Sequence, residues 1–392
     1  MHVAESVTTA PATNPPVRAG LEGVIAAETR LSEVDGAHGK LTIAGLPVEV
    51  LAARAGFEEV AYLLLYGALP TRTQLDAFAA TLVEHRPLPA PTLALLAAAA
   101  DRRVPPMDAL RMAAGTFDLD LSDAGDDEVA AALLARMPVA VAAYARLLQD
   151  APPVPPDPTL GHAANFLYML EDDVPTDAAA RALETYLITV VDHGLNASTF
   201  AARVIIATRS DLVSAVAGAL GALKGPLHGG APGPALDMVF EIGDAARAEP
   251  FLRAKLDRGE RLMGFGHRVY KVRDPRADVL AQAAQELFAG AAEDDAGRQL
   301  YALARAVEET AVRLLAEVKP GRNLQTNVEF YTALLLHGLG LSTDLFTPTF
   351  AVGRTAGWLA HCREQQATGR LIRPSSRYVG DFDRPWVEMD AR

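Results

Sequence analysis

The chain has 392 residues, of which 50% are hydrophobic and 22% are charged. This length allows two or three domains, and the composition excludes a mostly disordered or fibrous chain. Lys and Arg number 36 against 49 Asp and Glu, so the formal net charge is −13. Such an acidic chain offers no overall basic surface to nucleic acid or to an anionic membrane, and an anionic ligand needs a local cluster of Arg and His. The single cysteine, Cys362, excludes a disulfide framework within the chain and a cysteine-based zinc site.

Residues 1–18 are predicted to form a short flexible tail. They contain no basic region followed by an apolar core, so a signal peptide is not expected. The most apolar stretch, Val129–Leu148, is interrupted by Arg136, Pro138 and Arg146, and it lacks the roughly 20 uninterrupted apolar residues of a membrane span. We therefore expect a soluble cytoplasmic protein that has neither a membrane nor a nucleic acid as partner.

The chain from Gly20 onward is predicted to begin with a small β-hairpin and to continue as helices. Residues 20–45 mix β-branched side chains with the turn-like Asp35–Gly39. From Pro47 onward the apolar residues recur at three- and four-residue steps, which is the helical period. The helices predicted in this way are Phe57–Leu69, Arg72–His85, Thr92–Ala100, Ala109–Gly115, Val129–Leu148, Ala178–His193 and Ser210–Lys224. Strands do not alternate with helices, so the predicted fold class is mainly all-α.

Residues 151–158 are the clearest interruption of the helical pattern. Their prolines predict a stiff, extended connector. This connector either separates two domains or forms a surface loop within one domain.

Histidine and acidic residues gather in four short stretches, three of which are rich in glycine. These stretches are Asp192–Thr199 with His193, Gly225–Gly230 with His228, Gly264–Tyr270 with His267, and Asn327–Tyr331 with Glu329. Glycines beside His228 and His267 are expected to let backbone amides approach a ligand closely. Each histidine alone is equally compatible with an ordinary turn residue, and Glu329 alone with a solvated helix charge. Spacing alone does not bring the four stretches together.

Three arginines are placed by helix signals. Asp274–Arg276 supplies an N-cap residue, a proline for the first helical position and an arginine in the first turn, where backbone N–H groups favour an anion. Residues 347–348 predict another helix start, with Arg354 about two turns in, Gly369 as C-cap and Arg373 in the loop beyond. Arginine can bind both oxygens of a carboxylate, although a single arginine is more often a surface ion-pair residue.

Three of these stretches together resemble the catalytic segments of citrate synthases. They are Gly225–Gly230, Met263–Tyr270 and Asn327–Tyr331, and the resemblance extends over nearly the whole chain. It implies an almost entirely helical homodimer of the short bacterial type, in which a large and a small domain of each subunit close over the substrates. In this division residues 1–18 are a tail, 19–220 and 326–392 form the large domain with a C-terminal tail, and 221–325 form the small domain.

The resemblance implies the condensation of acetyl-CoA with oxaloacetate and water to citrate and CoA, without a metal or a separate cofactor. Glu329 would remove a proton from the acetyl methyl group, His228 would hydrogen-bond the thioester oxygen, and His267 would act on the ketone of oxaloacetate. The oxaloacetate-binding residues implied are His193, Arg276, Arg354 and, reaching across the dimer interface, Arg373. The CoA-binding residues implied are Met263, Gly264, Phe265, Gly266, Lys271, Lys319 and Arg322.

Three residues depart from the usual pattern of this family. Glu329 replaces an Asp, Thr326 replaces a Pro and Gly194 replaces a Glu. The extra methylene of Glu329 moves the carboxylate by roughly 1–1.5 Å, and a 1 Å misplacement can cost about a hundredfold in rate. Loss of the proline is expected to loosen the segment before Asn327, which would let the longer side chain settle.

Two alternatives remain open from the sequence. A 2-methylcitrate synthase would use propionyl-CoA with the same catalytic residues, because one methyl group is worth only about 1–3 kcal/mol of discrimination. A binding or regulatory paralogue with little turnover would be compatible with Glu329 in place of Asp.

Overall fold

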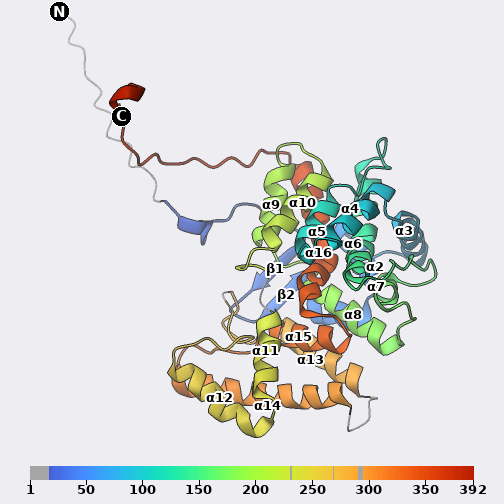
Figure 1. Ribbon diagram of the computed structural model, residues 1–392, viewed down its shortest axis with the longest axis vertical. Helices are drawn as coiled ribbons and strands as arrows, with labels where there is room; N and C mark the ends of the chain where they lie inside the picture. Colours follow the sequence, from blue (N-terminus) through green and yellow to red (C-terminus); the bar gives the residue numbers. More distant parts are fainter. Residues whose placement is uncertain (1–16, 230–231, 268, 290–294) are drawn as a thin grey trace, which may run out of the picture.

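The computed structural model describes residues 17–229, 232–267, 269–289 and 295–392 (Figure 1). Residues 1–16 of the predicted tail lie outside the described residues, as do Gly230 and Arg268 of the predicted catalytic stretches. Within the described ranges, helices dominate and one small sheet is present, which confirms the all-α prediction.

The described chain begins with a small sheet and continues as helices. The sheet is antiparallel, with the strands β1 (Ser32–Asp35), β2 (Lys40–Ile43) and β3 (Leu46–Pro47). The first eight helices are α1 (Val48–Arg54), α2 (Phe57–Tyr66), α3 (Arg72–His85), α4 (Ala90–Ala100), α5 (Pro106–Ala114), α6 (Asp126–Leu148), α7 (His162–Glu171) and α8 (Asp177–Val190). They are followed by α9 (Ala197–Ile206), α10 (Leu212–Leu223), α11 (Pro232–Ile242), α12 (Ala245–Asp257), α13 (Pro275–Phe288), α14 (Ala296–Val318), α15 (Val328–Gly338) and α16 (Phe346–Thr368). Short 3-10 turns lie at Ala19–Leu21, Thr343–Leu345 and Met389–Ala391.

The predicted hairpin is present, and it carries a third strand that was not predicted. Ser32 pairs with Ile43 across β1 and β2, and Leu46 pairs with Ile43 across β2 and β3. Leu41 and Ile43 point into the core and alternate with more exposed residues. A strand of two residues, such as β3, is too short for this alternation to appear in the sequence.

Capping residues explain several helix ends. Asp274 accepts a hydrogen bond from the backbone N of Arg276 and Pro275 takes the first helical position, as predicted. Gly369 ends α16 in the left-handed conformation with φ at 70°, also as predicted. The helix predicted to continue to His193 instead ends at Val190, which leaves His193 in the connection to α9.

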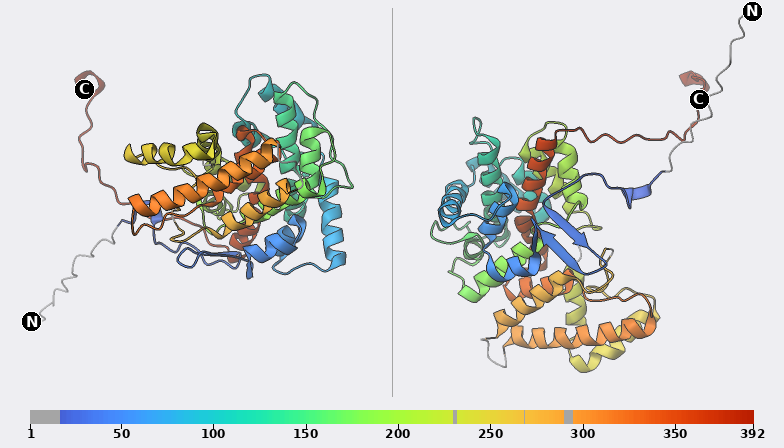
Figure 2. Two further views of the ribbon diagram at one scale, coloured as in Figure 1. Left: turned by 90° about the horizontal axis from the view of Figure 1, so that it is seen from below. Right: turned by 180° about the vertical axis from the view of Figure 1, so that it is seen from behind.

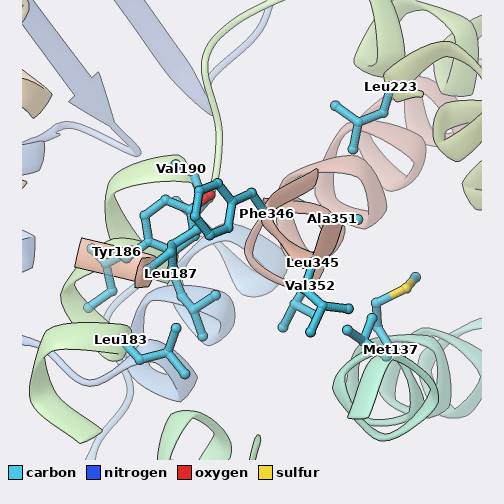
Figure 3. Close-up of a cluster of buried hydrophobic side chains, with 14 of the residues drawn as sticks. Met137, Leu183, Tyr186, Leu187, Val190, Leu223, Leu345, Phe346, Ala351 and Val352 are labelled. Carbon is cyan, nitrogen blue, oxygen red and sulfur yellow. The ribbon is translucent and has the colours of Figure 1, made fainter. Parts of the chain in front are cut away.

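Helix α16 is the element around which the larger part of the chain packs. It contacts α2, α6, α8, α9 and α10, and Trp358 in its middle is fully buried. Figure 3 shows Tyr186 of α8, Phe346 of α16 and Met137 of α6 among the apolar side chains of this core. Cys362, on the same helix, is buried, and burial raises the pKa of its thiol to about 12. Cys362 is therefore a packed core residue with a protonated thiol at neutral pH.

Helix α6 is a core helix that contacts α3, α4, α5, α7 and α16. Among the described residues it is the one helix long and apolar enough to cross a membrane by length and composition, but 83% of its most apolar window is buried inside the protein. Arg136, in the middle of α6, is also buried. Its guanidinium donates two hydrogen bonds of 2.6 Å to Asp120 and others to the carbonyls of His85, Pro87 and Phe117. A fully partnered arginine can therefore occupy this apolar helix.

The proline-rich connector 151–158 lies inside one packed unit. It joins α6 to α7, and these two helices pack against each other. Arg86 donates hydrogen bonds of 2.7 Å to the carbonyls of Asp157 and Leu160, and the backbone N of Asp157 donates to Asn165. Of the two interpretations of this segment, the loop within one domain is the correct one.

A second group of helices lies at one end of the molecule. Helix α12 packs on α14, α11 packs on α15, and α13 contacts both α15 and α8 of the larger group. Figures 1 and 2 show α11, α12 and α14 projecting away from the helices that surround α16. Helices α13 and α15 therefore lie between this group and the rest of the chain.

Substitution of Gly357 by alanine tests the packing of α16 on α8. A β-carbon at this position would lie 2.3 Å from the carbonyl oxygen of Val191 and 3.1 Å from Oδ1 of Asp192. We expect G357A to lower the free energy of unfolding by about 1–3 kcal/mol, because a closely packed interface accommodates extra volume only by moving backbone. Urea denaturation followed by circular dichroism measures the change.

Gly221 is the matched control, because its β-carbon would meet only Arg111 Cδ at 3.8 Å on an exposed part of α10. There alanine is expected to be neutral or to stabilise the helix by up to about 1 kcal/mol. Equal effects of G357A and G221A would contradict the packing argument.

Candidate functional site

Six of the seven residues predicted to bind oxaloacetate or to act in catalysis gather around one region. Helix α8 contacts α13, α15 and α16, and this packing brings the ends of distant segments together. The six residues are His193 after α8, His228 after α10, His267 before α13, Arg276 in the first turn of α13, Glu329 in the first turn of α15, and Arg354 in α16.

His193 and His267 face each other beside Tyr270. Their ring centroids are 6.0 Å apart, and His193 Nε2 lies 3.2 Å from the Tyr270 hydroxyl. Burial, reinforced by the positive charges of Arg276 and Arg354, lowers the pKa of His193 well below its ordinary value. His193 is therefore neutral at pH 7, with one ring nitrogen that donates and one that accepts.

The loop that carries His193 is fastened by the buried carboxylate of Asp192. Asp192 Oδ2 accepts a hydrogen bond of 2.5 Å from the Ser32 hydroxyl and one of 3.1 Å from His361 Nε2. Ser32 Oγ in turn accepts from the backbone N of Gly194 at 2.8 Å. Strand β1 and helix α16 thus hold the loop from two sides.

A buried run of hydrogen bonds continues from His361 towards the C-terminal segment. Arg203 donates from Nη1 to His361 Nδ1 at 3.0 Å and from Nε to Gln365 Oε1 at 3.1 Å. Gln365 Nε2 then donates to the carbonyl of Arg370 at 3.0 Å, where the chain leaves α16. One polar network therefore joins the His193 loop to the start of the C-terminal segment.

His228 lies against the first turn of α9. Its Nε2 is 2.8 Å from the Ser198 hydroxyl and accepts a hydrogen bond of 3.3 Å from the backbone N of Ser198. A ring nitrogen that accepts from a backbone N–H carries no hydrogen, so the hydrogen of the neutral ring lies on Nδ1. Burial, with a smaller contribution from Arg354, lowers the pKa of His228 to about 4. Trp358 Nε1 donates to the Ser198 hydroxyl at 3.1 Å and so connects His228 to α16.

His267 is oriented by backbone groups as well. Its Nδ1 accepts hydrogen bonds of 3.0 Å from the backbone N atoms of Val269 and Tyr270. The hydrogen of the neutral ring therefore lies on Nε2, the opposite assignment from His228. Burial and the charge of Arg276 lower the pKa of His267 to about 4, so this ring is also neutral at pH 7.

The Asp274 carboxylate joins Arg276 to the start of α15. Arg276 donates from Nε to Oδ1 at 3.0 Å and from Nη2 to Oδ2 at 2.8 Å, and both side chains are buried. Oδ2 also accepts from the backbone N of Val328 at 3.2 Å, one residue before Glu329. The guanidinium predicted to bind a ligand thus has one edge fixed by a carboxylate of its own chain.

Arg354 is buried in α16 with few protein partners. Its Nε donates to the carbonyl of Val190 at 2.5 Å, and its guanidinium carbon lies 4.5 Å from the centroid of the Phe350 ring. No carboxylate of the described residues lies within 4 Å of the guanidinium. Burial, with repulsion by Arg276, lowers the pKa of Arg354 to about 10. A buried cation without an adjacent carboxylate favours an anionic ligand.

Glu329 lies in the first turn of α15, which Asn327 caps. Its backbone N donates to Asn327 Oδ1 at 3.0 Å, while its carboxyl makes no hydrogen bond or ion pair with the described residues. Burial raises the pKa of Glu329 to about 7; Arg276 and Arg354 act in the opposite direction, and Asp274 adds to the rise. A carboxyl with such a pKa can take up or release a proton near neutral pH.

Residues 264–266 and 325–327 run antiparallel next to a cavity of about 530 Å³. Gly266 N donates to the carbonyl of Gln325 at 2.7 Å, and Asn327 N donates to the carbonyl of Gly264 at 3.0 Å. The cavity is lined by Arg261, Leu262, Phe265, Gly266, His267, Leu315, Lys319, Arg322 and Leu324. Three cations, an aromatic ring and one catalytic candidate thus share one opening, which suits a large anionic ligand.

Four of the seven predicted CoA-binding residues line this cavity, and three do not. The three are Gly264, which is buried, Met263 and Lys271. Gly264 and Gly229 also have close neighbours within the protein. A β-carbon would lie 2.8 Å from the Phe330 ring at Gly264, where φ is +85°, and 2.4 Å from the carbonyl oxygen of Leu223 at Gly229. Packing requires both glycines.

The prediction that Thr326 loosens the segment before Asn327 is wrong. Thr326 is 1% exposed, and its hydroxyl donates a hydrogen bond of 2.6 Å to Glu308 Oε1. Its backbone pairs with Phe265 in an isolated β-bridge. The segment before Asn327 is therefore held on both sides, by a bond that proline could not form.

Arg373 is the predicted site residue that does not join the others. It lies in the segment after Gly369, which is exposed almost throughout. Figure 1 shows this segment running away from the body of the molecule. Among the described residues Arg373 makes no hydrogen bond or ion pair with Glu329 or Arg354.

Several residues that hold the site were not predicted from the sequence. They are Ser198, Tyr270, Asp192, His361 and Glu308. Asp192, Ser198 and Tyr270 lie inside stretches that were singled out, so their polar groups were a usable signal. His361 and Glu308 lie outside these stretches, and their partners are more than a hundred residues away or on another helix, which no local pattern contains. In the described ranges no three His, Cys, Asp or Glu side chains gather as a metal site requires.

Comparison with known proteins gives a consistent result. The family model described as "Citrate synthase, C-terminal domain" matches residues 20–375. A citrate synthase of Haloferax volcanii is 43% identical, over 96% of this chain and 99% of the relative. A 2-methylcitrate synthase of Mycobacterium tuberculosis is 40% identical, over 94% and 92% of the two chains. The crystal structure of citrate synthase from Pyrobaculum aerophilum has a TM-score of 0.87 at 36% identity and covers 100% of both chains.

The raised pKa of Glu329 predicts a pH-dependent stability difference between the native chain and E329Q. The native state holds the Glu329 proton up to about pH 7, whereas the unfolded chain releases it near 4.5. Stability from this group is therefore present below pH 4.5 and is lost as the pH rises through 7, by about 3 kcal/mol in total. We expect E329Q to become more stable relative to the native chain over this range, as measured by urea unfolding at several pH values. A difference independent of pH would contradict the assigned pKa.

Proposed function

Because the chain belongs to the citrate synthase family, we propose that this enzyme condenses acetyl-CoA with oxaloacetate and water to give citrate and free CoA. The observation that carries the proposal is the position of Glu329, a carboxyl with a pKa of about 7 near Arg276 and Arg354. Two neutral histidines with defined hydrogen positions complete a set of groups suited to forming and trapping an enolate.

Glu329 is the proposed base that removes a proton from the methyl group of acetyl-CoA. Its raised pKa brings its basicity closer to that of the carbon acid than an ordinary carboxylate would, and a substantial fraction remains ionised at neutral pH. Its carboxyl has no hydrogen-bond partner among the described residues, so no protein donor competes for the oxygen that must accept the proton.

His228 is the proposed donor to the thioester oxygen. Ser198 holds its Nε2 as an acceptor, so the Nδ1–H is available to a ligand. With a pKa of about 4, the ring donates a hydrogen bond from its neutral form and stabilises the negative charge that develops on oxygen as the methyl proton leaves.

His267 is the proposed donor to the ketone oxygen of oxaloacetate. Because the backbone N–H groups of Val269 and Tyr270 occupy its Nδ1, the Nε2–H is left to donate to the ketone oxygen. As the enolate carbon attacks the ketone carbon, the ketone oxygen gains negative charge and takes a hydrogen bond or proton from His267. Water then hydrolyses the citryl thioester and releases CoA.

Arg276, Arg354 and His193 are the proposed ligands of oxaloacetate. Oxaloacetate brings two carboxylates, and the two arginines are both buried; among the described residues, Asp274 forms an ion pair with Arg276 and no carboxylate forms one with Arg354. If Arg354 binds both oxygens of an oxaloacetate carboxylate, that carboxylate supplies the negative charge that the protein does not place beside Arg354. We propose that Arg373 of a partner subunit supplies the further cation, which makes the active unit a homodimer.

CoA is proposed to occupy the cavity beside Phe265 and Gly266. Lys319 and Arg322 would bind its phosphates, and the end of the cavity at His267 would lead the thioester to the reacting groups. Met263, Gly264 and Lys271 stay predicted contacts from the family resemblance.

Propionyl-CoA is the second candidate substrate, because relatives named citrate synthase and 2-methylcitrate synthase are similar to this chain at 43% and 40% identity. The proposed catalytic residues serve either acyl group. One methyl group is worth about 1–3 kcal/mol, so the two activities differ by selectivity rather than by mechanism.

Thiol release with oxaloacetate and either acetyl-CoA or propionyl-CoA tests the proposed function. We expect the higher kcat/KM with acetyl-CoA and a kcat that rises with pH to a plateau above about 7, because the base must be ionised. E329Q is expected to lose at least about a hundredfold in kcat, and E329D about tenfold or more, because its carboxylate is withdrawn. A preference for propionyl-CoA would assign the second candidate. No oxaloacetate-dependent release with either thioester would leave the binding or regulatory paralogue.

Subunit complementation tests the contribution of Arg373. R373A and E329Q homodimers are each expected to be nearly inactive. In a co-expressed mixture, a heterodimer has one site with both substitutions and one site with neither, so about a quarter of native activity should return. Absence of recovery, with heterodimers verified by differential tags, would show that Arg373 does not act across the interface.

A further inference from the structure

Behind the proposed base lies a buried carboxylate that takes no part in the proposed chemistry. Glu308, in the middle of α14, is 3% exposed. Both of its oxygens are occupied, Oε1 by the Thr326 hydroxyl at 2.6 Å and Arg273 Nη1 at 2.7 Å, and Oε2 by Arg305 Nη1 at 2.9 Å and the Tyr331 hydroxyl. Although burial raises the pKa of Glu308, the hydroxyl donors and the charge of Arg273 outweigh it and lower the pKa, so the group is ionised.

Three of the four donors flank residues that are proposed to act on the substrates. Thr326 stands three residues before Glu329, and Tyr331 stands two residues after it. Arg273 directly precedes Asp274, whose carboxylate binds Arg276 and the backbone N of Val328. The Glu308 carboxylate on α14 therefore binds side chains on both sides of Glu329. It also binds Arg273, the residue before Asp274.

The bond from Thr326 depends on its hydroxyl, at a position where the family resemblance implies a proline. A proline at this position has no hydroxyl and could not donate to Glu308. The same turn carries the second departure, the longer Glu329, whose additional rotatable bond increases the freedom of its carboxylate. A firmer first turn offsets part of that freedom.

We propose that Glu308 is a positioning residue for catalysis: through Thr326 and Tyr331 it fixes the first turn of α15, and so fixes where the carboxylate of Glu329 meets the acyl group. This inference rests on the proposed function of Glu329 as base. Glu308 itself does not touch a substrate, and its effect passes through the backbone of residues 326–331.

The test is a set of substitutions at Thr326 in the full chain, assayed by thiol release. T326V removes the hydroxyl at nearly constant volume, and T326S restores it. We expect T326V to lower kcat about tenfold with less than a twofold change in the KM for oxaloacetate, and T326S to stay within about twofold of the native kcat. In T326V the midpoint of the pH profile should move upward, because a displaced Glu329 lies farther from Arg276 and Arg354.

T189V is the matched control, because Thr189 is also fully buried but donates only to the carbonyl of Thr185 within its own helix, at 2.6 Å. It should leave kcat and the pH midpoint unchanged. Y331F removes the other hydroxyl donor, and its effect on kcat combined with T326V should be non-additive if both act through Glu308. A native kcat and pH midpoint in T326V, or an equal loss in T189V, would overturn the proposal.

The native chain is assayed first, so that failure of the proposed function is distinguishable. If it shows no turnover, the difference in unfolding free energy between E329Q and the native chain is measured against pH with and without T326V, and the pH at which this difference levels off is compared, because the folded-state pKa of Glu329 sets that pH. This measurement needs no substrate. An upward move of that pH in the T326V background supports the positioning role, and an unchanged value overturns it.

Discussion

The Asp274 carboxylate is the interaction on which the site depends. It caps α13, binds the guanidinium of Arg276 through two hydrogen bonds and accepts the backbone N of Val328. These contacts set the first turns of α13 and α15 against each other. Removing the carboxylate would leave a buried guanidinium without its counter-charge, which costs far more than the pair itself contributes.

The positive charges near Asp274 exceed the negative charges. Two buried arginines and one carboxyl face the same region, and burial acts on each of them. Arg354 has a lowered pKa and Glu329 a raised one, as expected when charged groups lose water without gaining full partners. The buried positive charge is therefore not fully compensated within the protein, and a ligand with two negative charges can compensate it.

Local sequence signals predicted two helix ends and the hairpin because these depend on neighbours a few residues apart. Asp274 as N-cap, Gly369 as C-cap and the β1–β2 turn are of this kind. The predicted clustering of His193, His228 and Glu329 came from resemblance to a family, since nothing in their spacing brings them together. The hydrogen positions on His228 and His267 depend on Ser198 and on backbone N–H groups, which only the folded chain places. The expected looseness at Thr326 failed for the same reason, because its partner Glu308 lies on another helix.

The buried position of Cys362 has a practical consequence for studying this protein. It is the one sulfhydryl of the chain, and in the folded state it is both inaccessible and protonated at neutral pH. A coloured reagent that reacts with thiolates therefore reports released CoA without a background from the native protein. The same reagent detects one additional thiol per chain when α16 leaves the core and exposes Cys362. Reactivity of this thiol therefore measures unfolding around α16.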